Sequence, residues 1–210
     1  MSGAVTSVLF VGVAGQAVAA TARLLAEAAA AAGLAVLYSE APAAMPGGGS
    51  VGASVRIGDA ASPVVSLGEA DVLVAFDGLE ALRAAPLLAK GGFAAVNEHV
   101  VPTWRMRAGL DARPADVLAR IQEVAPRAVG VRADALARAS GEGEALAGLA
   151  LLGVVAALLP VPAAALDAVV AAGGAGATAR RRALDRGRHL FQALPARLAQ
   201  PPPPPNEAGR

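Results

Sequence analysis

The first thirty residues combine a short apolar run, a small turn and a long alanine-rich segment. Residues 8–29 read VLFVGVAGQAVAATARLLAEAA. An unbroken apolar run is typical of a strand that is covered on both faces. The segment 15–32 predicts a helix that stops at Gly33, because glycine readily adopts the left-handed conformation that follows a helix. This strand–turn–helix order limits the chain to folds that are built on an α/β unit.

The same alternation continues along the first two thirds of the chain. Predicted strands cover residues 7–13, 34–40, 51–58, 70–76, 93–100 and 127–133. Predicted helices cover residues 15–32 and 78–92, and segment 111–123 contains a third that starts near Pro114. Polar residues interrupt segment 51–58, so we expect it to be an edge or half-exposed strand. The short connections predict an α/β fold with a doubly wound, mostly parallel, Rossmann-like sheet.

Beyond residue 133 the strand pattern stops and a C-terminal helical extension is predicted. The helices cover residues 133–140, 144–159, 163–172 and 178–193, and QPPPPPNEAGR at 200–210 predicts an extended tail outside any core. We therefore expect an α/β domain (1–140), C-terminal helices packed on the same domain (141–195) and a flexible proline-rich tail (196–210).

The chemistry available to the chain is narrow. With 18 basic and 17 acidic residues, its formal net charge of +1 argues against nucleic acid or an anionic membrane as a partner. The chain has no cysteine to ligate an iron–sulfur cluster, and its two histidines, His99 and His189, lie far apart in the sequence. We expect no metal site, and no nucleophile–base arrangement identifies a catalytic residue.

One stretch, residues 145–166, is uncharged and long enough to span a bilayer. Pro160 and Pro162 interrupt it, and it consists largely of alanine and glycine, so a buried helix of a soluble protein is favoured over a membrane span. The N-terminal MSGAVTS lacks the basic segment of a signal peptide, so we expect a cytoplasmic protein.

The turn after the first strand does not match the dinucleotide fingerprint Gly-x-Gly-x-x-Gly. It reads GVAGQA at residues 12–17, and the methyl group of Ala14 restricts the approach of a pyrophosphate. Glu40 ends the second strand, where a ribose-binding carboxylate lies in that fold. Three interpretations stay open: a dinucleotide site, an anion held by the helix N-terminus with the Gln16 amide, and a plain packing turn.

Several segments, taken in order, resemble the gamma domain of the 2-oxoacid:ferredoxin oxidoreductases. The turn resembles the family pattern Gly-x-Gly-Gly-Gln-Gly, and it is followed at the same spacing by Ser39-Glu40 and by the run Gly48-Gly49-Ser50-Val51. Residues 68–97 and 146–170 are similar to two later segments, so the resemblance covers about residues 6–193. Within the family, the indolepyruvate type is the most similar.

The resemblance implies a small subunit that assists the oxidative decarboxylation of 2-oxo acids, of the indolepyruvate or aryl-pyruvate type, and is inactive alone. It implies a larger partner subunit that carries thiamine diphosphate and iron–sulfur clusters, and ferredoxin as the acceptor of the complex. This chain alone would bind no cofactor. Carried over by position, the residues expected to contact a cofactor or ligand are Gly12, Gly15, Gln16, Glu40, Gly48, Gly49, Ser50 and Asn97.

The chain departs from the family pattern at two places. Ala14 and Ala17 replace two glycines of the turn, and residues 42–47 (PAAMPG) replace a family segment His-Gly-Met-Ala-Gln-Arg whose polar groups are able to bind an anion. These changes indicate either a paralogue with an altered substrate or a mainly structural domain. A stand-alone Rossmann-like nucleotide-binding protein is the alternative outside the family.

Three further features have two interpretations each. His99 follows a strand and is either a cleft residue or ordinary surface. The run WRMR at 104–107 has the composition of a partner contact, or contains a partly buried tryptophan between solvated arginines. The arginines of residues 179–189 indicate a solvated helix face or a subunit contact rather than a nucleic-acid surface.

Overall fold

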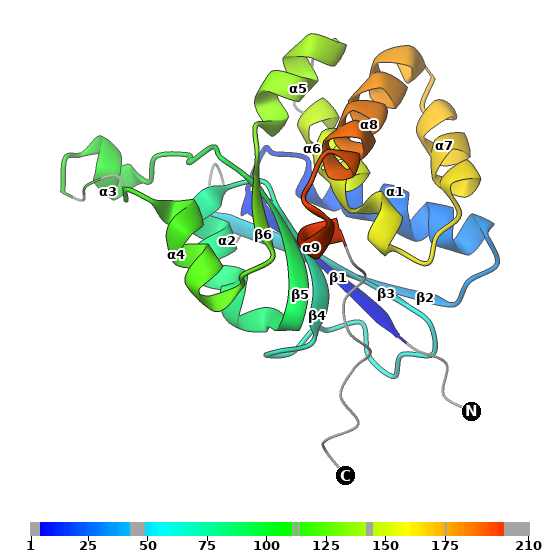
Figure 1. Ribbon diagram of the computed structural model, residues 1–210, viewed down its shortest axis with the longest axis horizontal. Helices are drawn as coiled ribbons and strands as arrows, with labels where there is room; N and C mark the ends of the chain where they lie inside the picture. The colour runs from blue at the N-terminus through cyan, green and yellow to red at the C-terminus, as the bar shows by residue number, and fades with distance from the viewer. Residues whose placement is uncertain are drawn as a thin grey trace.

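A six-stranded sheet forms the centre of the protein (Figure 1). The computed structural model describes residues 5–42, 49–110, 112, 114–141, 145–174 and 176–199. The strands lie in the order β2-β3-β1-β4-β5-β6. Their bounds are β1 Thr6–Val13, β2 Val36–Ala41, β3 Ser50–Ile57, β4 Ala70–Ala75, β5 Leu88–Asn97 and β6 Ala128–Val131.

The sheet is mostly parallel, as predicted, but one strand runs the other way. Strand β1 pairs in parallel with β4, β4 with β5, and β5 with β6, whereas β3 is antiparallel to both β1 and β2. Too few residues separate β2 from β3 for a crossover helix, so β3 must return antiparallel. Of the two alternatives for this segment, the edge strand was wrong, because β3 lies between β1 and β2. The strand is half-exposed only in part: Val55 is fully buried, and Arg56 is intermediate.

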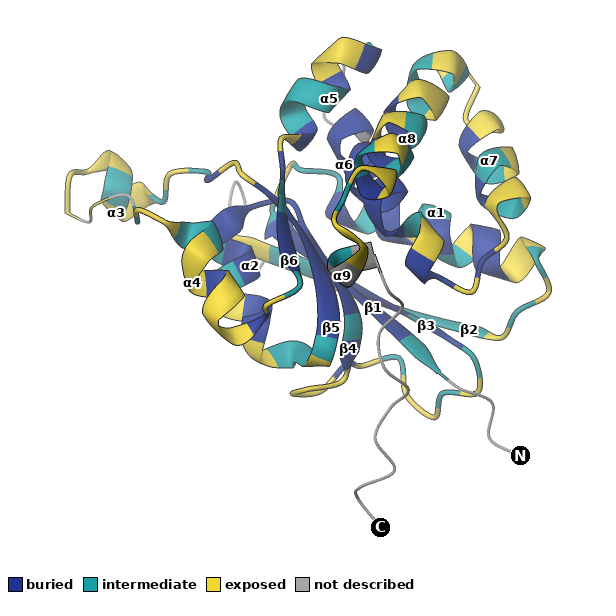
Figure 2. Cartoon of the chain, viewed as in Figure 1, coloured by how far each residue is buried: buried dark blue, intermediate teal, exposed yellow. Residues whose placement is uncertain are grey.

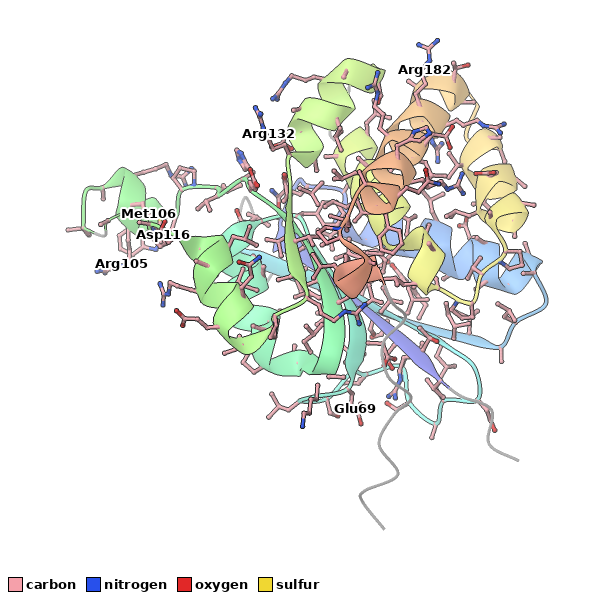
Figure 3. All side chains as sticks on the ribbon, viewed as in Figure 1. Glu69, Arg105, Met106, Asp116, Arg132 and Arg182 are labelled. Atoms are coloured by element: carbon pink, nitrogen blue, oxygen red, sulfur yellow. The ribbon has the colours of Figure 1, made fainter. Side chains whose placement is uncertain are left out.

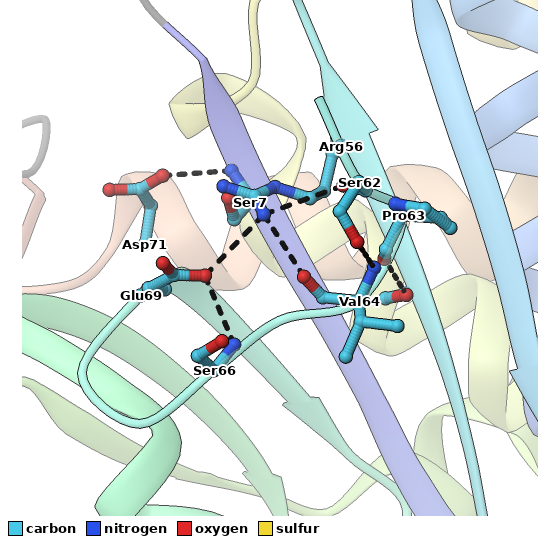
Figure 4. A network of polar contacts seen from close by, with 9 residues as sticks. Ser7, Arg56, Ser62, Pro63, Val64, Ser66, Glu69 and Asp71 are labelled. Carbon is cyan, nitrogen blue, oxygen red and sulfur yellow. Dashed lines mark hydrogen bonds and ion pairs between the residues drawn. The ribbon is translucent and has the colours of Figure 1, made fainter. Parts of the chain in front are cut away.

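A network of polar contacts lets Arg56 occupy this inner strand (Figure 4). Its Nη1 donates to the carbonyl oxygens of Ser62 and Val64 and contacts the Glu69 carboxylate at 3.4 Å. The Ser54 hydroxyl donates to the Pro63 carbonyl at 2.6 Å. The loop after β3 therefore packs back on that strand, and the polar residues that suggested an edge are used to hold the loop.

Helices cover the two faces of the sheet in separate layers (Figures 1 and 2). Alternate residues of β1 point to opposite faces: Val8 and Phe10 belong to the larger core cluster, Leu9 and Val11 to the smaller one. The larger cluster includes residues of helices α1 Val18–Ala31, α5 Ala133–Ser140, α6 Ala145–Val155, α7 Ala163–Ala171 and α8 Ala177–Gln192. The smaller cluster includes residues of α2 Gly78–Ala84 and α4 Val117–Val124.

Helix α6 accounts for the apolar stretch that resembled a membrane span. Every residue from Leu146 to Val155 is buried, and α6 packs closely along α8. The helix continues as one 3-10 turn, η2 (Ala156–Leu158), before the chain turns into α7. In the described ranges, no helix is long and apolar enough to cross a bilayer.

Several predicted bounds were wrong around α2 and α4. The helix expected over 78–92 ends at Ala84; the 3-10 turn η1 (Ala85–Leu87) contains Pro86, and β5 begins at once. Proline cannot donate the hydrogen bond that continues a helix, which explains the early end. The helix expected to start near Pro114 begins at Val117, and the short α3 (Trp104–Arg107) was not predicted.

The C-terminal helices share one core with the α/β part. The larger cluster joins strand residues such as Phe93 to Leu152 of α6 and Phe191 of α8, and the Phe93 and Phe191 rings meet edge to face at 6.0 Å. The predicted boundary at residue 140, between the α/β domain and the C-terminal helices, stays a prediction. The short α9 (Ala196–Ala199) follows α8, and the polyproline run lies outside the described residues.

Candidate functional site

A cleft of about 690 Å³ opens where the parallel strands β1, β4 and β5 end. The carboxyl edge of such a sheet is the usual place for a ligand in an α/β fold. The cleft is walled by the β1 turn, the ends of β4 and β5, and helices α5 and α6. Its lining residues are Val13, Ala14, Gly15, Gln16, Phe76, Asn97, His99, Val101, Asp134, Ala137, Arg138, Gly141 and Ala147.

Two amide side chains tie the floor of this cleft together. Gln16 Oε1 accepts from Val13 N at 2.7 Å, and its Nε2 donates to the Phe76 carbonyl at 3.2 Å. Asn97 Nδ2 donates to the same carbonyl at 3.1 Å, and its Oδ1 accepts from Ala133 N at 3.1 Å. The ends of β1 and β5 are therefore joined at the Phe76 carbonyl, directly after β4, and Asn97 also holds the start of α5.

Gly12 is required by packing inside the protein. A Cβ at this position would lie 2.7 Å from Val18 Cγ2, 2.8 Å from Gln16 Oε1 and 2.9 Å from Phe76 Cβ. Gly15 has open space around it but a φ of +98°, which disfavours other residues. The two glycines thus serve different purposes, close contact at Gly12 and backbone conformation at Gly15.

Ala17 has a left-handed backbone with φ of 58°, although it carries a side chain. We expect Ala17→Gly to raise the free energy of unfolding by about 1 kcal/mol. Relief of the left-handed conformation, which costs alanine roughly 1–2 kcal/mol, stabilises the variant. The greater freedom of glycine in the unfolded chain cancels part of this gain. Ala14→Gly is the matched control: Ala14 does not have a positive φ, so the same change there is expected to be destabilising. Urea unfolding measures both, and equal effects of the two changes would contradict the strain at Ala17.

Gly49 and Ser50 lie beside the turn but do not line the cleft. Ala14 N donates to the Gly49 carbonyl at 3.0 Å, and Ser50 is the β-partner of Val13. The Ser50 hydroxyl accepts from Arg83 of α2 at 3.4 Å. Gly48, which was also predicted to contact a ligand, lies outside the described residues.

Glu40 is separated from the turn by a whole strand. In a dinucleotide fold the second strand is next to the first, whereas here β3 lies between them. The Glu40 carboxylate accepts from the Tyr38 hydroxyl and contacts Arg23 Nη2 at 2.5 Å. These hydrogen bonds, the one from Tyr38 first, lower the pKa of Glu40, and burial raises the pKa of Tyr38 to about 12. The arrangement disfavours Glu40 as a ribose ligand of a nucleotide at the turn.

Polar side chains from the loop after β5 and from α5 meet at the mouth of the cleft. His99 Nδ1 lies 3.4 Å from Asp134 Oδ2, and both side chains are partly exposed. Arg138 lines the same cleft one helical turn after Asp134. The sequence analysis named His99 but missed Asp134 and Arg138. A signal for Asp134 was present, because residues 132–134 directly follow the predicted last strand, and the carboxyl ends of neighbouring parallel strands meet at one edge of the sheet.

The described residues include no group of three or more His, Cys, Asp or Glu side chains close enough to hold a metal ion. The whole sequence also lacks cysteine. The cleft lining instead contains the imidazole of His99, the carboxylate of Asp134 and the guanidinium of Arg138. All three are able to form hydrogen bonds, and the guanidinium is suited to contact with an anion.

Comparison with known proteins finds relatives both in sequence and in fold. The indolepyruvate oxidoreductase subunit IorB of Archaeoglobus fulgidus is 34% identical over 137 residues, which are 64% of this chain and 68% of that protein. The keto/oxoacid ferredoxin oxidoreductase gamma subunit of Geobacter sulfurreducens superposes with a TM-score of 0.66 and 21% identity, over 90% of this chain and 99% of that one.

A larger protein also contains this fold. The 2-oxoglutarate:ferredoxin oxidoreductase of Magnetococcus marinus, solved with 2-oxoglutarate, coenzyme A and succinyl-CoA bound, has a TM-score of 0.71 and 19% identity. The match covers 98% of this chain but only 34% of that polypeptide. The family model described as pyruvate ferredoxin/flavodoxin oxidoreductase matches residues 7–190. The chain therefore belongs to the pyruvate ferredoxin/flavodoxin oxidoreductase family.

Proposed function

We propose that this chain is the small, cluster-free subunit of a 2-oxoacid:ferredoxin oxidoreductase of the indolepyruvate type. The observation that carries the proposal is the match to the family over residues 7–190, together with the 34% identity to an indolepyruvate oxidoreductase subunit. Oxidative decarboxylation releases electrons, and a chain without cysteine has no thiolate ligands for a cluster that would carry them. The thiamine diphosphate and the clusters accordingly belong to a larger partner subunit.

In this proposal the cleft faces the reaction centre of the partner. The tied floor at Phe76, Gln16 and Asn97 keeps the cleft rigid, while His99, Asp134 and Arg138 form its polar rim. A guanidinium and an imidazole at the rim are suited to hold an anionic group of the substrate in place. The residues of this chain thus position the substrate, and the bond-breaking chemistry takes place on the partner.

Co-expression with the thiamine- and cluster-bearing subunit tests the proposal. We expect the two chains to co-purify and to reduce a viologen dye with indolepyruvate faster than with pyruvate or 2-oxoglutarate, and this chain alone to be inactive. Turnover by this chain alone, or full activity of the large subunit without it, would contradict the proposal.

Substitutions at the rim test the role of the cleft. His99→Ala and Arg138→Ala should each lower kcat/KM about tenfold, because a hydrogen bond to a charged group contributes about 1.5–3 kcal/mol and 1.4 kcal/mol is tenfold. Arg182→Ala on α8 (Figure 3) is the control, because that side chain is exposed and does not line the cleft. Unchanged kinetics in both rim variants would indicate a domain whose role in the complex is structural.

A further inference from the structure

The segment Val101–Leu110, here called the arm, projects from the body of the protein (Figure 1). Its root is fixed, because Val101 N donates to the buried Asp77 carboxylate at 2.6 Å. Thr103 caps the short helix α3 by accepting from Met106 N, and Leu110 N closes the turn by donating to the Arg105 carbonyl at 2.9 Å. The arm therefore has a defined conformation at a distance from the core.

The arm exposes large apolar side chains of a kind that folded proteins usually bury. Trp104 is the only tryptophan of the chain and is 64% exposed, and Leu110 is 59% exposed. Tryptophan is among the residues most enriched where binding energy concentrates in protein interfaces. An ordered arm that presents such a residue to solvent has the character of a binding element.

The charged and aromatic side chains of the arm indicate which kind of protein surface would bind it. Residues 101–110 contain Arg105 and Arg107, and Asp111 follows them directly in the sequence. The guanidinium of Arg105 lies over the Trp104 ring, 5.6 Å from its centre, so cation and aromatic face are presented together. Figure 3 labels Arg105 and Met106 on α3, with Asp116 labelled beside them. For Trp104 and Arg107, the complementary surface is an apolar recess with carboxylate groups on its rim.

The position of the arm next to the cleft indicates which protein binds it. Val101 is both the first residue of the arm and part of the cleft lining, and His99 of the cleft rim lies two residues earlier. A large protein that binds the arm as far as its root therefore lies beside the mouth of the cleft. We infer that the arm docks into an acidic-rimmed apolar recess of the large subunit and so seats that subunit's reaction centre over the cleft; this rests on the proposed function.

Binding of purified large subunit to arm variants tests the inference. Trp104→Ala should weaken binding at least about 30-fold, the usual effect at a dominant interface residue. Arg107→Glu should weaken it about tenfold and reduce its dependence on salt, because a charge attraction becomes a repulsion. Leu67→Ala is the matched control, since Leu67 is 74% exposed on a different loop, and it should bind like the wild type.

The outcomes separate the two proposals. If the wild type binds and Trp104→Ala binds equally well with an unchanged melting temperature, the arm is not the docking element and the proposed function stands. If Trp104→Ala instead changes the sedimentation of this chain alone, the arm contacts a second copy and the inference is overturned. If the wild type does not bind the large subunit, the proposed function fails and the inference fails with it.

Discussion

Gly187→Ala is expected to lower the free energy of unfolding by about 3 kcal/mol, the upper range for overpacking a core. A Cβ on Gly187 of α8 would lie 2.0 Å from the Ala150 carbonyl oxygen and 2.9 Å from Gly153 Cα. A Cβ on Gly153 would likewise lie 2.1 Å from the Leu184 carbonyl. The obstructing atoms belong to the backbone, so the two helices must move apart.

Helix propensity predicts the opposite sign, which makes the measurement decisive. Alanine is about 1 kcal/mol more favourable than glycine inside a helix, whereas separating α6 from α8 disturbs side chains such as Leu149 and Leu152 that are almost completely buried. We expect the packing effect to win. Urea unfolding of Gly187→Ala and Gly153→Ala measures it directly.

Gly52→Ala is the control for this substitution. A Cβ there meets the Phe10 carbonyl oxygen at 3.5 Å, an ordinary contact. Its unfolding midpoint should stay close to that of the wild type. A Gly187→Ala protein as stable as Gly52→Ala would show that the two helices are not in backbone contact.

Asp77→Ala should destabilise the protein by at least about 3 kcal/mol, because a single hydrogen bond to a charged group contributes about 1.5–3 kcal/mol. Asp77 is 1% exposed and accepts three backbone hydrogen bonds. Oδ1 caps α2 by accepting from Leu79 N at 2.8 Å and Glu80 N at 3.2 Å, and Oδ2 accepts from Val101 N at 2.6 Å. Alanine leaves all three N–H groups without this partner.

Two further variants isolate the cause of this loss. Asp77→Asn retains one carbonyl oxygen for the helix cap but cannot accept from Val101 with its NH₂ group, so about half of the loss is expected. Asp59→Ala, at an exposed carboxylate, should lie within about 0.5 kcal/mol of the wild type. Thermal and urea unfolding of the three proteins decide the order, and equal stability of Asp77→Ala and Asp59→Ala would refute the role of Asp77.

The same substitution connects stability with assembly. Because Asp77 holds the root of the arm at Val101, Asp77→Ala should also weaken binding of the large subunit. Asp77 was missed as a site residue, yet its local signal was present. An acidic residue three positions before Glu80 and at the start of an apolar helical pattern is a typical N-cap arrangement.

Local sequence patterns were sufficient to predict the fold class and the family of this protein. The alternation of apolar runs with helical segments predicted an α/β fold with a mostly parallel sheet, and the spacing of Gly12, Gly15 and Gln16 with later motifs pointed to the family. These features depend on backbone geometry within a few residues: side chains repeat every two residues in a strand and every 3.6 in a helix. Pro86 shows the limit, since its effect on the end of α2 was overlooked although it is equally local.

Tertiary structure alone decided which distant residues meet. The insertion of antiparallel β3 moved Glu40 one strand away from the turn, and no pattern within β2 or β3 indicates that order. Gln16 bonds to a carbonyl 60 residues away, and His99 meets Asp134 through the pairing of β5 with β6. A sequence determines the periodicity of each element by itself, but the distance between elements follows from how their apolar faces are buried together, and that is a property of the whole chain.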